Sequence, residues 1–300
     1  MVIQNPRVSI GLPVFNGEAY LREAIDSLLV QTFTDFELII SDNASIDKTE
    51  EICKEYSIKD NRIRYYRNEQ NIGAIPNHNL TFQLSRGEFF KWAAHDDLHS
   101  PDYLQRCVEI LQQDESVILC YAKTTLIDKD GKIVGKYNAT QKADSLKPNE
   151  RFRDIILYEY RCYQIYGVMR SSILKKVPPL GNFQSSDNAF LARLSLLGRF
   201  YEIPEYLFFN RRHSMQGSAI VAEAGLQAYG SFFSSKQDGS IDLPRWRMLK
   251  KHCASVWDAS LSWHERLSCW RHIPTWLYEK RHGLKEDLLA AAKYFVHYPN

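Results

Sequence analysis

The chain has 300 residues, of which 44% are hydrophobic and 25% charged, a composition typical of a soluble globular protein with one large domain or one domain plus an appendage. Its net charge of +2 gives no reason to expect nucleic acid as a partner. No apolar run approaches the ~20 residues of a membrane-spanning helix, the N-terminus does not read as a secretory signal, and the six cysteines form no CxxC pair, so we expect a cytoplasmic protein with reduced thiols.

The first half of the chain alternates between two hydrophobic periodicities. Apolar runs predict strands at 8–14, 36–41, 63–66, 89–93 and 117–122, and helical spacing predicts helices between them, around 20–29, 47–56, 77–84 and 102–112. Such alternation is typical of a mostly parallel sheet with helices on both faces. Gly11 and Gly17 do not have the G-x-G-x-x-G spacing, which argues against a dinucleotide-binding dehydrogenase.

The pattern weakens after Lys123. Asp130-Gly131 predicts a hairpin turn, and further elements are expected as a helix at 152–157, a strand at 165–169, an amphipathic helix at 188–197 and an aromatic strand at 206–209. After about Ser218 the chain looks helical and carries five of the six tryptophans, interleaved with Lys and Arg. We therefore predict a domain of residues 1–217 and a helical C-terminal extension of residues 218–300.

Two adjacent carboxylates, Asp96 and Asp97, end the apolar run at 89–93. In an open α/β sheet, ligands bind at the carboxyl edge of the strands, and Mg²⁺ typically takes one or two carboxylates plus substrate phosphates. The pair is therefore a candidate holder for a metal–diphosphate. The alternative is that one aspartate caps the next helix, but Ser100 and Pro101 already supply an N-cap and a first-turn proline.

Several motifs stand at the ends of the predicted strands, and their order is informative. They read VSIGLPVFNG, SDNASIDKT, NEQNIGAIPNHN, AHDD, QSSDNAFLARLSLLGRF and FFNRRHSMQGS. In order and spacing this set resembles family 2 of the inverting glycosyltransferases, which have the GT-A fold and serve bacterial polysaccharide assembly; the likeness covers roughly residues 6–215. The resemblance implies a GT-A α/β fold and transfer of a sugar from a nucleoside-diphosphate sugar, with UDP favoured, to an acceptor hydroxyl.

The resemblance also implies a nucleotide site made by the first three motifs. Asp42 would accept the N3–H of uracil, although an Asx-turn that ends the strand is the alternative. The other residues expected to border the nucleotide are Pro13, Phe15, Asn16, Asn71, Gly73 and Asn77.

The remaining motifs carry the implied metal and catalytic groups. Asp96 matches the family's metal-ligating aspartate, which also lies at the nucleotide, and Asp97 is its neighbour, whereas Ala94 replaces the first aspartate of the signature. Mg²⁺ or Mn²⁺ is the implied cofactor. Arg211, Arg212 and His213 would reach the diphosphate or complete the metal shell, the alternative being a solvated basic turn. Asp187 would be the catalytic base, the alternative being an ordinary N-cap.

Two other functions remain open. A nucleotidyltransferase also holds a metal beside a nucleotide, but Pro13 to Asn16 is not its Gly-rich basic loop. A non-catalytic sugar- or nucleotide-binding module stays open because of Ala94. Expected partners are the donor and a glycan or lipid-linked saccharide acceptor.

The extension also has two interpretations. Its aromatic and basic helices either pack against the catalytic domain or a second subunit, or lie at the inner face of the cell membrane as a peripheral contact. We favour packing because no clean amphipathic stripe is evident.

Overall fold

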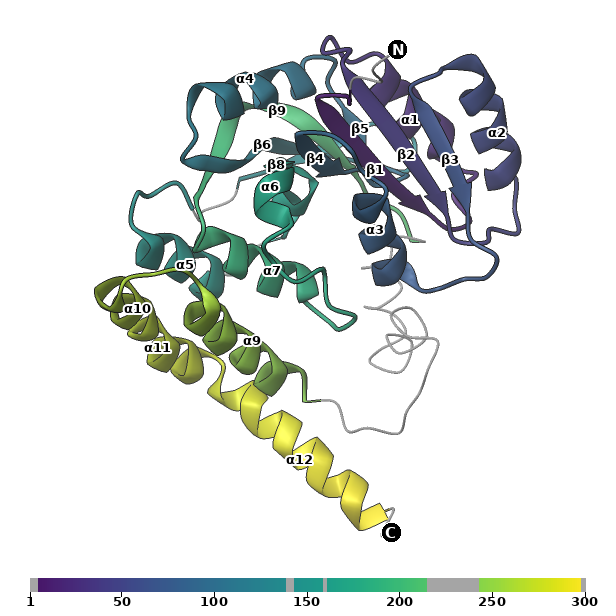
Figure 1. The fold of residues 1–300 in the computed structure, drawn as a ribbon. Helices are drawn as coiled ribbons and strands as arrows, with labels where there is room; N and C mark the ends of the chain where they lie inside the picture. The colour runs from purple at the N-terminus through teal and green to yellow at the C-terminus, as the bar shows by residue number, and fades with distance from the viewer. Residues whose placement is uncertain (1–4, 139–142, 159–160, 215–242, 298–300) are drawn as a thin grey trace.

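The computed structural model describes residues 5–138, 143–158, 161–214 and 243–297 (Figure 1). Its centre is a mixed sheet of nine strands in the order β3-β2-β1-β4-β8-β6-β9-β5, with β7 paired to β6. The strands are β1 Val8–Val14, β2 Phe36–Asp42, β3 Ile63–Arg67, β4 Phe89–Trp92, β5 Leu98–His99, β6 Val117–Ile127, β7 Ile133–Tyr137, β8 Val168–Arg170 and β9 Arg199–Arg211.

Helices cover both faces of the sheet. They are α1 Leu21–Leu29, α2 Thr49–Lys59, α3 Ala74–Gln83, α4 Tyr103–Gln113, α5 Pro148–Leu157, the 3₁₀ turn η1 Tyr163–Tyr166, α6 Ser171–Leu174, α7 Ser186–Ser195, α9 Pro244–Asp258, α10 Trp263–Trp270, α11 His272–Glu279 and α12 Arg281–His297. The buried apolar side chains form two clusters. One joins the sheet to α1, α2 and α4, and the other joins it to α5, α7 and the C-terminal helices.

The parallel half of the sheet explains where a ligand site can form. β1 pairs in parallel with both β2 and β4, and β2 pairs in parallel with β3. All seven residues of β1 and of β2 are buried, as expected for strands covered on both faces. The carboxyl ends of these strands meet at one edge, so the residues that follow them are brought together there. The predicted α/β class with helices on both faces is confirmed, and the sheet is mixed because β5, β7 and β8 pair antiparallel with their neighbours.

Three local predictions are wrong. Residues 165–169 are not one strand, because the chain turns through η1 and reaches Gly167, where an added Cβ would lie 2.8 Å from the Cys120 carbonyl oxygen; β8 begins only after it. The final strand is much longer than 206–209, because its pairing with β6 shifts register around Pro204 and then continues. Ser100 and Pro101 do not open a helix, since residues 98–99 pair with β9 and α4 begins at Tyr103. The predicted hairpin is confirmed, with Gly131 at φ +81°.

The C-terminal helices are part of the same hydrophobic core. The predicted boundary at residue 217 lies outside the described residues. Figure 1 shows α9, α10 and α11 gathered beside α5 and α7, and Val256, Cys269 and Trp276 are buried in one cluster with Phe152 of α5 and Leu191 of α7. In the described part of the chain, every helix is too short or too polar to cross a lipid bilayer.

Candidate active site

A cavity of about 870 Å³ opens at the carboxyl edge of the parallel strands. Its walls come from segments far apart in the sequence: the end of β1, α3, the segment after β4, η1, the start of α7, the end of β9, and α9 with α11 (Figure 1). Of the residues predicted from sequence, four line it, namely Pro13, Asp96, Asp97 and Asp187. Asp96, the expected metal ligand, and Asp187, the expected catalytic base, therefore share one cavity.

Asp96 is held as an ionised carboxylate. It is 6% exposed, and its Oδ2 lies 2.9 Å from Nε2 of His213. Burial alone would favour the neutral acid, but the hydrogen bond from His213 and the nearby charge of His95 outweigh it, so the pKa of Asp96 lies below its ordinary value. His213 itself stacks at 4.7 Å on the ring of Tyr20. These contacts hold the Asp96 carboxylate at the cavity wall.

Asp97 has a structural role that the sequence did not reveal. Its Oδ1 accepts a hydrogen bond of 3.0 Å from Nδ2 of Asn210 and one of 2.9 Å from the backbone N–H of Arg211, both at the end of β9. Burial, and then the charge of Asp96, raise the pKa of Asp97 well above its ordinary value. Asp97 thus ties β9 to the loop that follows β4.

Asp187 stands at the start of α7, on another wall of the cavity. Ser185, just before the helix, has the left-handed value φ +62°, and Oδ1 of Asp187 accepts a 2.8 Å hydrogen bond from the N–H of Asn188. Asp187 is the second residue of α7, whose N-cap is Ser185, so this contact lies within the first turn of the helix and is not the ordinary N-cap of the alternative interpretation. It occupies one oxygen and leaves Asp187 partly exposed along the cavity wall.

The two arginines after the last strand have different surroundings. Arg211 is fully buried: its Nη2 lies 2.6 Å from Oε2 of Glu23, and its Nε donates to the Asp96 carbonyl oxygen at 2.9 Å. It is not among the residues that line the cavity. Arg212 lines the cavity and donates to the hydroxyl of Tyr163. The structure therefore brings Arg212 to the cavity and places Arg211 behind it.

Asp42 is enclosed at the end of β2. It is 0% exposed, and its Oδ1 accepts from the N–H of Ser45 at 2.9 Å, as in the predicted Asx-type turn. Its Oδ2 accepts from the hydroxyl of Tyr65 at 2.9 Å and lies 3.5 Å from Nε of Arg67. These three donors enclose the Asp42 carboxylate within the protein. The uracil ring of a bound nucleotide would therefore reach it only after a local rearrangement.

The other predicted nucleotide residues join neighbouring loops. Asn16, at φ +51°, accepts at Oδ1 from the N–H of Ile46 at 3.0 Å. Oδ1 of Asn71 accepts from Nδ2 of Asn43 at 2.7 Å and from the N–H of Gly73, which has φ +93°. Asn77 is 2% exposed and bonds to Ser41 through both ends of its amide. Phe15 is the exception, since its ring is 43% exposed beside Pro13.

Sequence reasoning missed the wall formed by the C-terminal helices. Met248 and His252 of α9 and Trp276 of α11 line the cavity. His252 is 1% exposed, and neither ring nitrogen has a hydrogen-bond partner among the described residues. Its ring lies between those of Phe152 and Trp276, with centroids at 6.1 and 5.4 Å. No local motif signals this position, because α9 follows the last strand by more than thirty residues.

The donor atoms at the sheet edge fit a divalent cation that also binds a diphosphate. Within the described ranges, no group of three or more His, Cys, Asp or Glu side chains gathers as a closed metal site. Asp96 and His213, 2.9 Å apart, provide one carboxylate and one imidazole. A cation such as Mg²⁺ commonly takes only one or two protein ligands and completes its shell with substrate phosphates and water.

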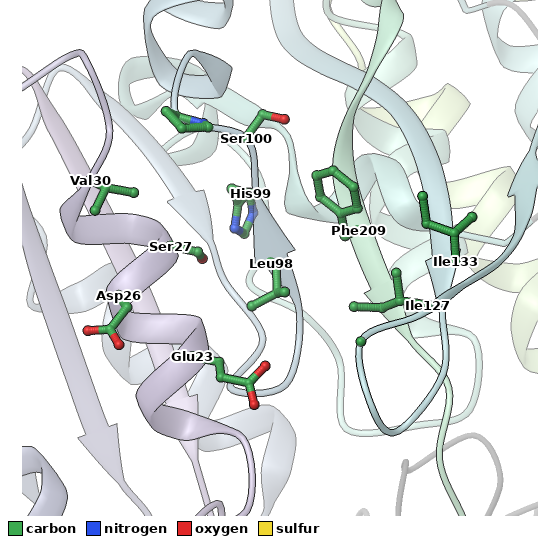
Figure 2. A pocket seen from close by; sticks show the side chains of 12 residues that line it. Glu23, Asp26, Ser27, Val30, Leu98, His99, Ser100, Ile127, Ile133 and Phe209 are labelled. Carbon is green, nitrogen blue, oxygen red and sulfur yellow. The ribbon is translucent and has the colours of Figure 1, made fainter.

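A second, shallower cavity of about 600 Å³ lies on the other side of β5. Figure 2 shows its walls, which come from α1 (Glu23, Asp26, Ser27, Val30), β5 (Leu98, His99) and β9 (Phe209). None of the predicted site residues lines it, so it is separate from the site described above.

The chain was compared with known families and proteins. The family model described as glycosyl transferase family 2 matches residues 9–176. The chain belongs to this family. The match includes the segments that carry Pro13, Asp42 and Asp96, and ends before Asp187.

Curated relatives agree with the family. The chain is 34% identical over 184 residues to an uncharacterized glycosyltransferase of Rickettsia typhi, covering 58% of this chain and 53% of the relative. It is 30% identical over 181 residues to an uncharacterized glycosyltransferase of Methanocaldococcus jannaschii, covering 58% and 59%. The family 2 chain described here therefore spans a little over half the length of these relatives.

Solved glycosyltransferase structures have the same fold as this chain at low sequence identity, which confirms the predicted GT-A fold class. TarS 1-349 of S. aureus, in complex with UDP-GlcNAc, has a TM-score of 0.67 at 16% identity, covering 94% of this chain and 79% of that one. The mannosyltransferase PcManGT of Pyrobaculum calidifontis, in complex with GDP-Man and Mn²⁺, has a TM-score of 0.56 at 13% identity, covering 99% and 77%.

Proposed function

We propose that this chain transfers a sugar from a nucleoside-diphosphate sugar, with UDP favoured as the nucleotide, to an acceptor hydroxyl, with inversion at the anomeric carbon. The observation that carries the proposal is the single cavity lined by Asp96 at the sheet edge and by Asp187 at the start of α7. Binding of UDP-GlcNAc by TarS and of GDP-Man by PcManGT supports the donor class. Assembly of a bacterial polysaccharide is the setting that we propose for this reaction.

The leaving group would be bound at the sheet edge. Asp96, together with His213, would hold Mg²⁺ or Mn²⁺, as the Mn²⁺ complex of PcManGT supports. When bound, such an ion stabilises the negative charge that develops on the departing diphosphate. Of the two arginines expected near the diphosphate, Arg212 would make the phosphate contact, because it is the one on the cavity wall and a guanidinium matches phosphate oxygens in bidentate geometry.

The acceptor proton would pass to Asp187. Asp187 lines the cavity, and its Oδ1 accepts from the N–H of Asn188. Inversion by direct displacement requires one general base, and expulsion of a metal-bound diphosphate requires no protonating acid, unlike hydrolysis of a glycoside.

The acceptor itself would lie against the C-terminal helices. Burial lowers the pKa of His252 to about 4, so its imidazole is neutral near pH 7 and carries one N–H donor and one acceptor nitrogen. It lies beside the indole of Trp276 in the same wall, and its buried nitrogens would reach the hydroxyls of a sugar after a local rearrangement. A glycan or a lipid-linked saccharide therefore remains the acceptor that we propose.

A non-catalytic nucleotide-binding module is the second candidate. Ala94 lies in the cavity wall where the resemblance expects the first aspartate of the signature. Such a module would bind the donor but release no UDP.

The test begins with the donor. Thermal unfolding is followed with UDP-glucose, UDP-galactose, UDP-GlcNAc and GDP-mannose, each with and without Mn²⁺, since a ligand that binds the native state raises its stability. UDP or GDP release is then measured with the stabilising donor and a panel of glycosides.

Asp187→Asn separates catalysis from binding. It is expected to lower release by about 10²- to 10⁴-fold and leave donor stabilisation unchanged, whereas Asp35→Asn, at an exposed position before β2, is the matched control. If none of the donors raises the melting temperature, the proposed nucleotide site is wrong. If the Asp187→Asn variant releases UDP or GDP at the wild-type rate, Asp187 is not the catalytic base.

A further inference from the structure

Two tryptophans of the C-terminal helices are more than half exposed, whereas Trp246 is 37% exposed and Trp276 is buried. Trp257 at the end of α9 is 62% exposed and Trp263 at the start of α10 is 71% exposed. Leu267, one turn further along α10, is 62% exposed. By contrast, Trp276 is 4% exposed in the core. Packing of the extension, which we favoured from sequence, therefore accounts for Trp276 and leaves Trp257 and Trp263 without a role.

A fixed cation joins the two exposed indoles. The guanidinium of Arg266 lies 5.7 Å from the ring centroid of Trp257 and 5.5 Å from that of Trp263. The same group donates to the carbonyl oxygens of Val256 and Ala259, at 3.2 and 3.1 Å, and so closes the end of α9. Trp257, Trp263, Arg266 and Leu267 thus form one surface, the tryptophan patch, held by backbone contacts.

Helix α9 has two opposite faces with different surroundings. Met248 and His252 on its inner face are buried and line the proposed active site. Trp257 lies nine residues after Met248, which is half a turn away in an α-helix. Lys250, seven residues before Trp257, is exposed on the same outer face. The outer face therefore continues the tryptophan patch along the helix that walls the cavity.

Positive charge is concentrated in this part of the chain. From Pro244 to Arg271 there are six Lys and Arg residues and two Asp and Glu residues, although the whole chain has a net charge of only +2. One of the two acids, Asp258, is paired with Arg193, and the other, Glu265, accepts from the N–H of Ser262 as a helix cap. Of the cations, Arg245 is paired with Asp287 and Glu286 and lines the active-site cavity, whereas Lys250, Lys251 and Arg271 are exposed and can attract an anionic partner.

We propose that the tryptophan patch seats this protein on the surface of an anionic lipid bilayer. Indole rings favour the headgroup level of a membrane, and each nearby Lys or Arg adds attraction to anionic lipid. Since α9 is about 10 Å across, the bilayer surface would lie about one helix diameter from the inner wall of the cavity. That position suits an acceptor whose saccharide is carried on a lipid. Vesicle binding requires no catalysis, so it can be tested whether or not the proposed reaction holds.

The test is co-sedimentation with vesicles. The full chain is mixed with vesicles of phosphatidylcholine alone, and with vesicles in which about one third of the lipid is phosphatidylglycerol. We expect binding to the anionic vesicles, a blue shift of tryptophan emission, and weaker binding at high salt. Trp257→Ser combined with Trp263→Ser should weaken binding by about tenfold or more, and Lys250→Gln by about fivefold.

Matched variants separate the patch from exposed apolar surface in general. Ile58→Ser removes a side chain that is 86% exposed on α2, and it should leave vesicle binding unchanged. Leu267→Ser tests the patch without changing a tryptophan. The proposal fails if the wild-type chain does not sediment with anionic vesicles, or if the double tryptophan variant binds as well as the wild type. It also fails if the wild type is a dimer in solution that the double variant converts to a monomer, because a second copy then covers the patch.

Discussion

The substitution His252→Phe tests whether His252 is a buried imidazole without hydrogen-bond partners in the cavity wall. The imidazole is 1% exposed between Phe152 and Trp276, and neither of its nitrogens has a partner within the described part of the chain. A phenyl ring has a similar size and keeps both edge contacts. Leaving a buried polar atom unpaired costs about 1–3 kcal/mol, so the phenylalanine variant should be more stable at pH 7.

The size of the stability difference between the wild type and His252→Phe should depend on pH. Burial lowers the pKa of His252 from 6.5 to about 4 in the folded chain. Between those values the unfolded chain binds a proton that the folded chain does not, so wild-type stability falls as the pH falls. At about 1.36 kcal/mol per pH unit, the full difference is about 3.4 kcal/mol. His252→Phe removes this loss, and its advantage over the wild type should grow from pH 6.5 down to pH 4.

Urea unfolding at several pH values between 7 and 4 measures the effect. His282→Phe, at an exposed position on α12, is the control and should give a stability difference that changes little with pH. If the free energies of unfolding of the wild type and of His252→Phe change in parallel over this pH range, His252 is not a buried, neutral imidazole. On the activity side, the KM for the acceptor should rise in His252→Phe while the affinity for the donor is unchanged.

Three further outcomes are expected at the sheet edge. Asp96→Ala should abolish the Mn²⁺-dependent part of UDP affinity measured by calorimetry, and an unchanged affinity would exclude the metal role. Arg212→Met should weaken UDP binding by about 1.5–3 kcal/mol with little change in the melting temperature, whereas Arg211→Met should lower the melting temperature because the Asp96 carbonyl oxygen loses its buried donor. Asp97→Asn should keep the fold, since an amide oxygen can still accept from Asn210 and from the backbone; marked loss of stability in thermal unfolding would contradict this.

The parallel half of the fold was predictable from the sequence for a local reason. Strands buried on both faces are continuous apolar runs, as in 8–14 and 36–41, and the chain must turn where each run ends. Parallel pairing then brings those ends to one edge, so the motifs around Pro13 and Asp96 could be placed together from the sequence alone. The order and spacing of the short motifs therefore indicate which residues meet at this edge, because each motif follows its own strand.

The rest depended on contacts between distant segments. Nothing near Arg211 indicates that its side chain turns back to Glu23, 188 residues earlier, while its neighbour Arg212 faces the cavity. The contribution of α9 was equally hidden, because Met248 and His252 have the spacing of any buried helix face. Short elements without periodicity, such as the two residues of β5, were also missed, since they exist only through pairing with β9.

The adjacent aspartates show why a shared motif does not imply a shared role. Two full negative charges side by side in a buried site repel each other, and the protein separates them by environment. Asp96 accepts a hydrogen bond from His213 and has a lowered pKa, whereas Asp97 is enclosed and has a pKa raised well above its ordinary value. Asp97 instead fixes the end of β9, and that strand end presents Arg212 to the cavity and His213 to Asp96. Under the proposed function, one carboxylate would bind the ion, and its neighbour holds the strand that completes the cavity wall.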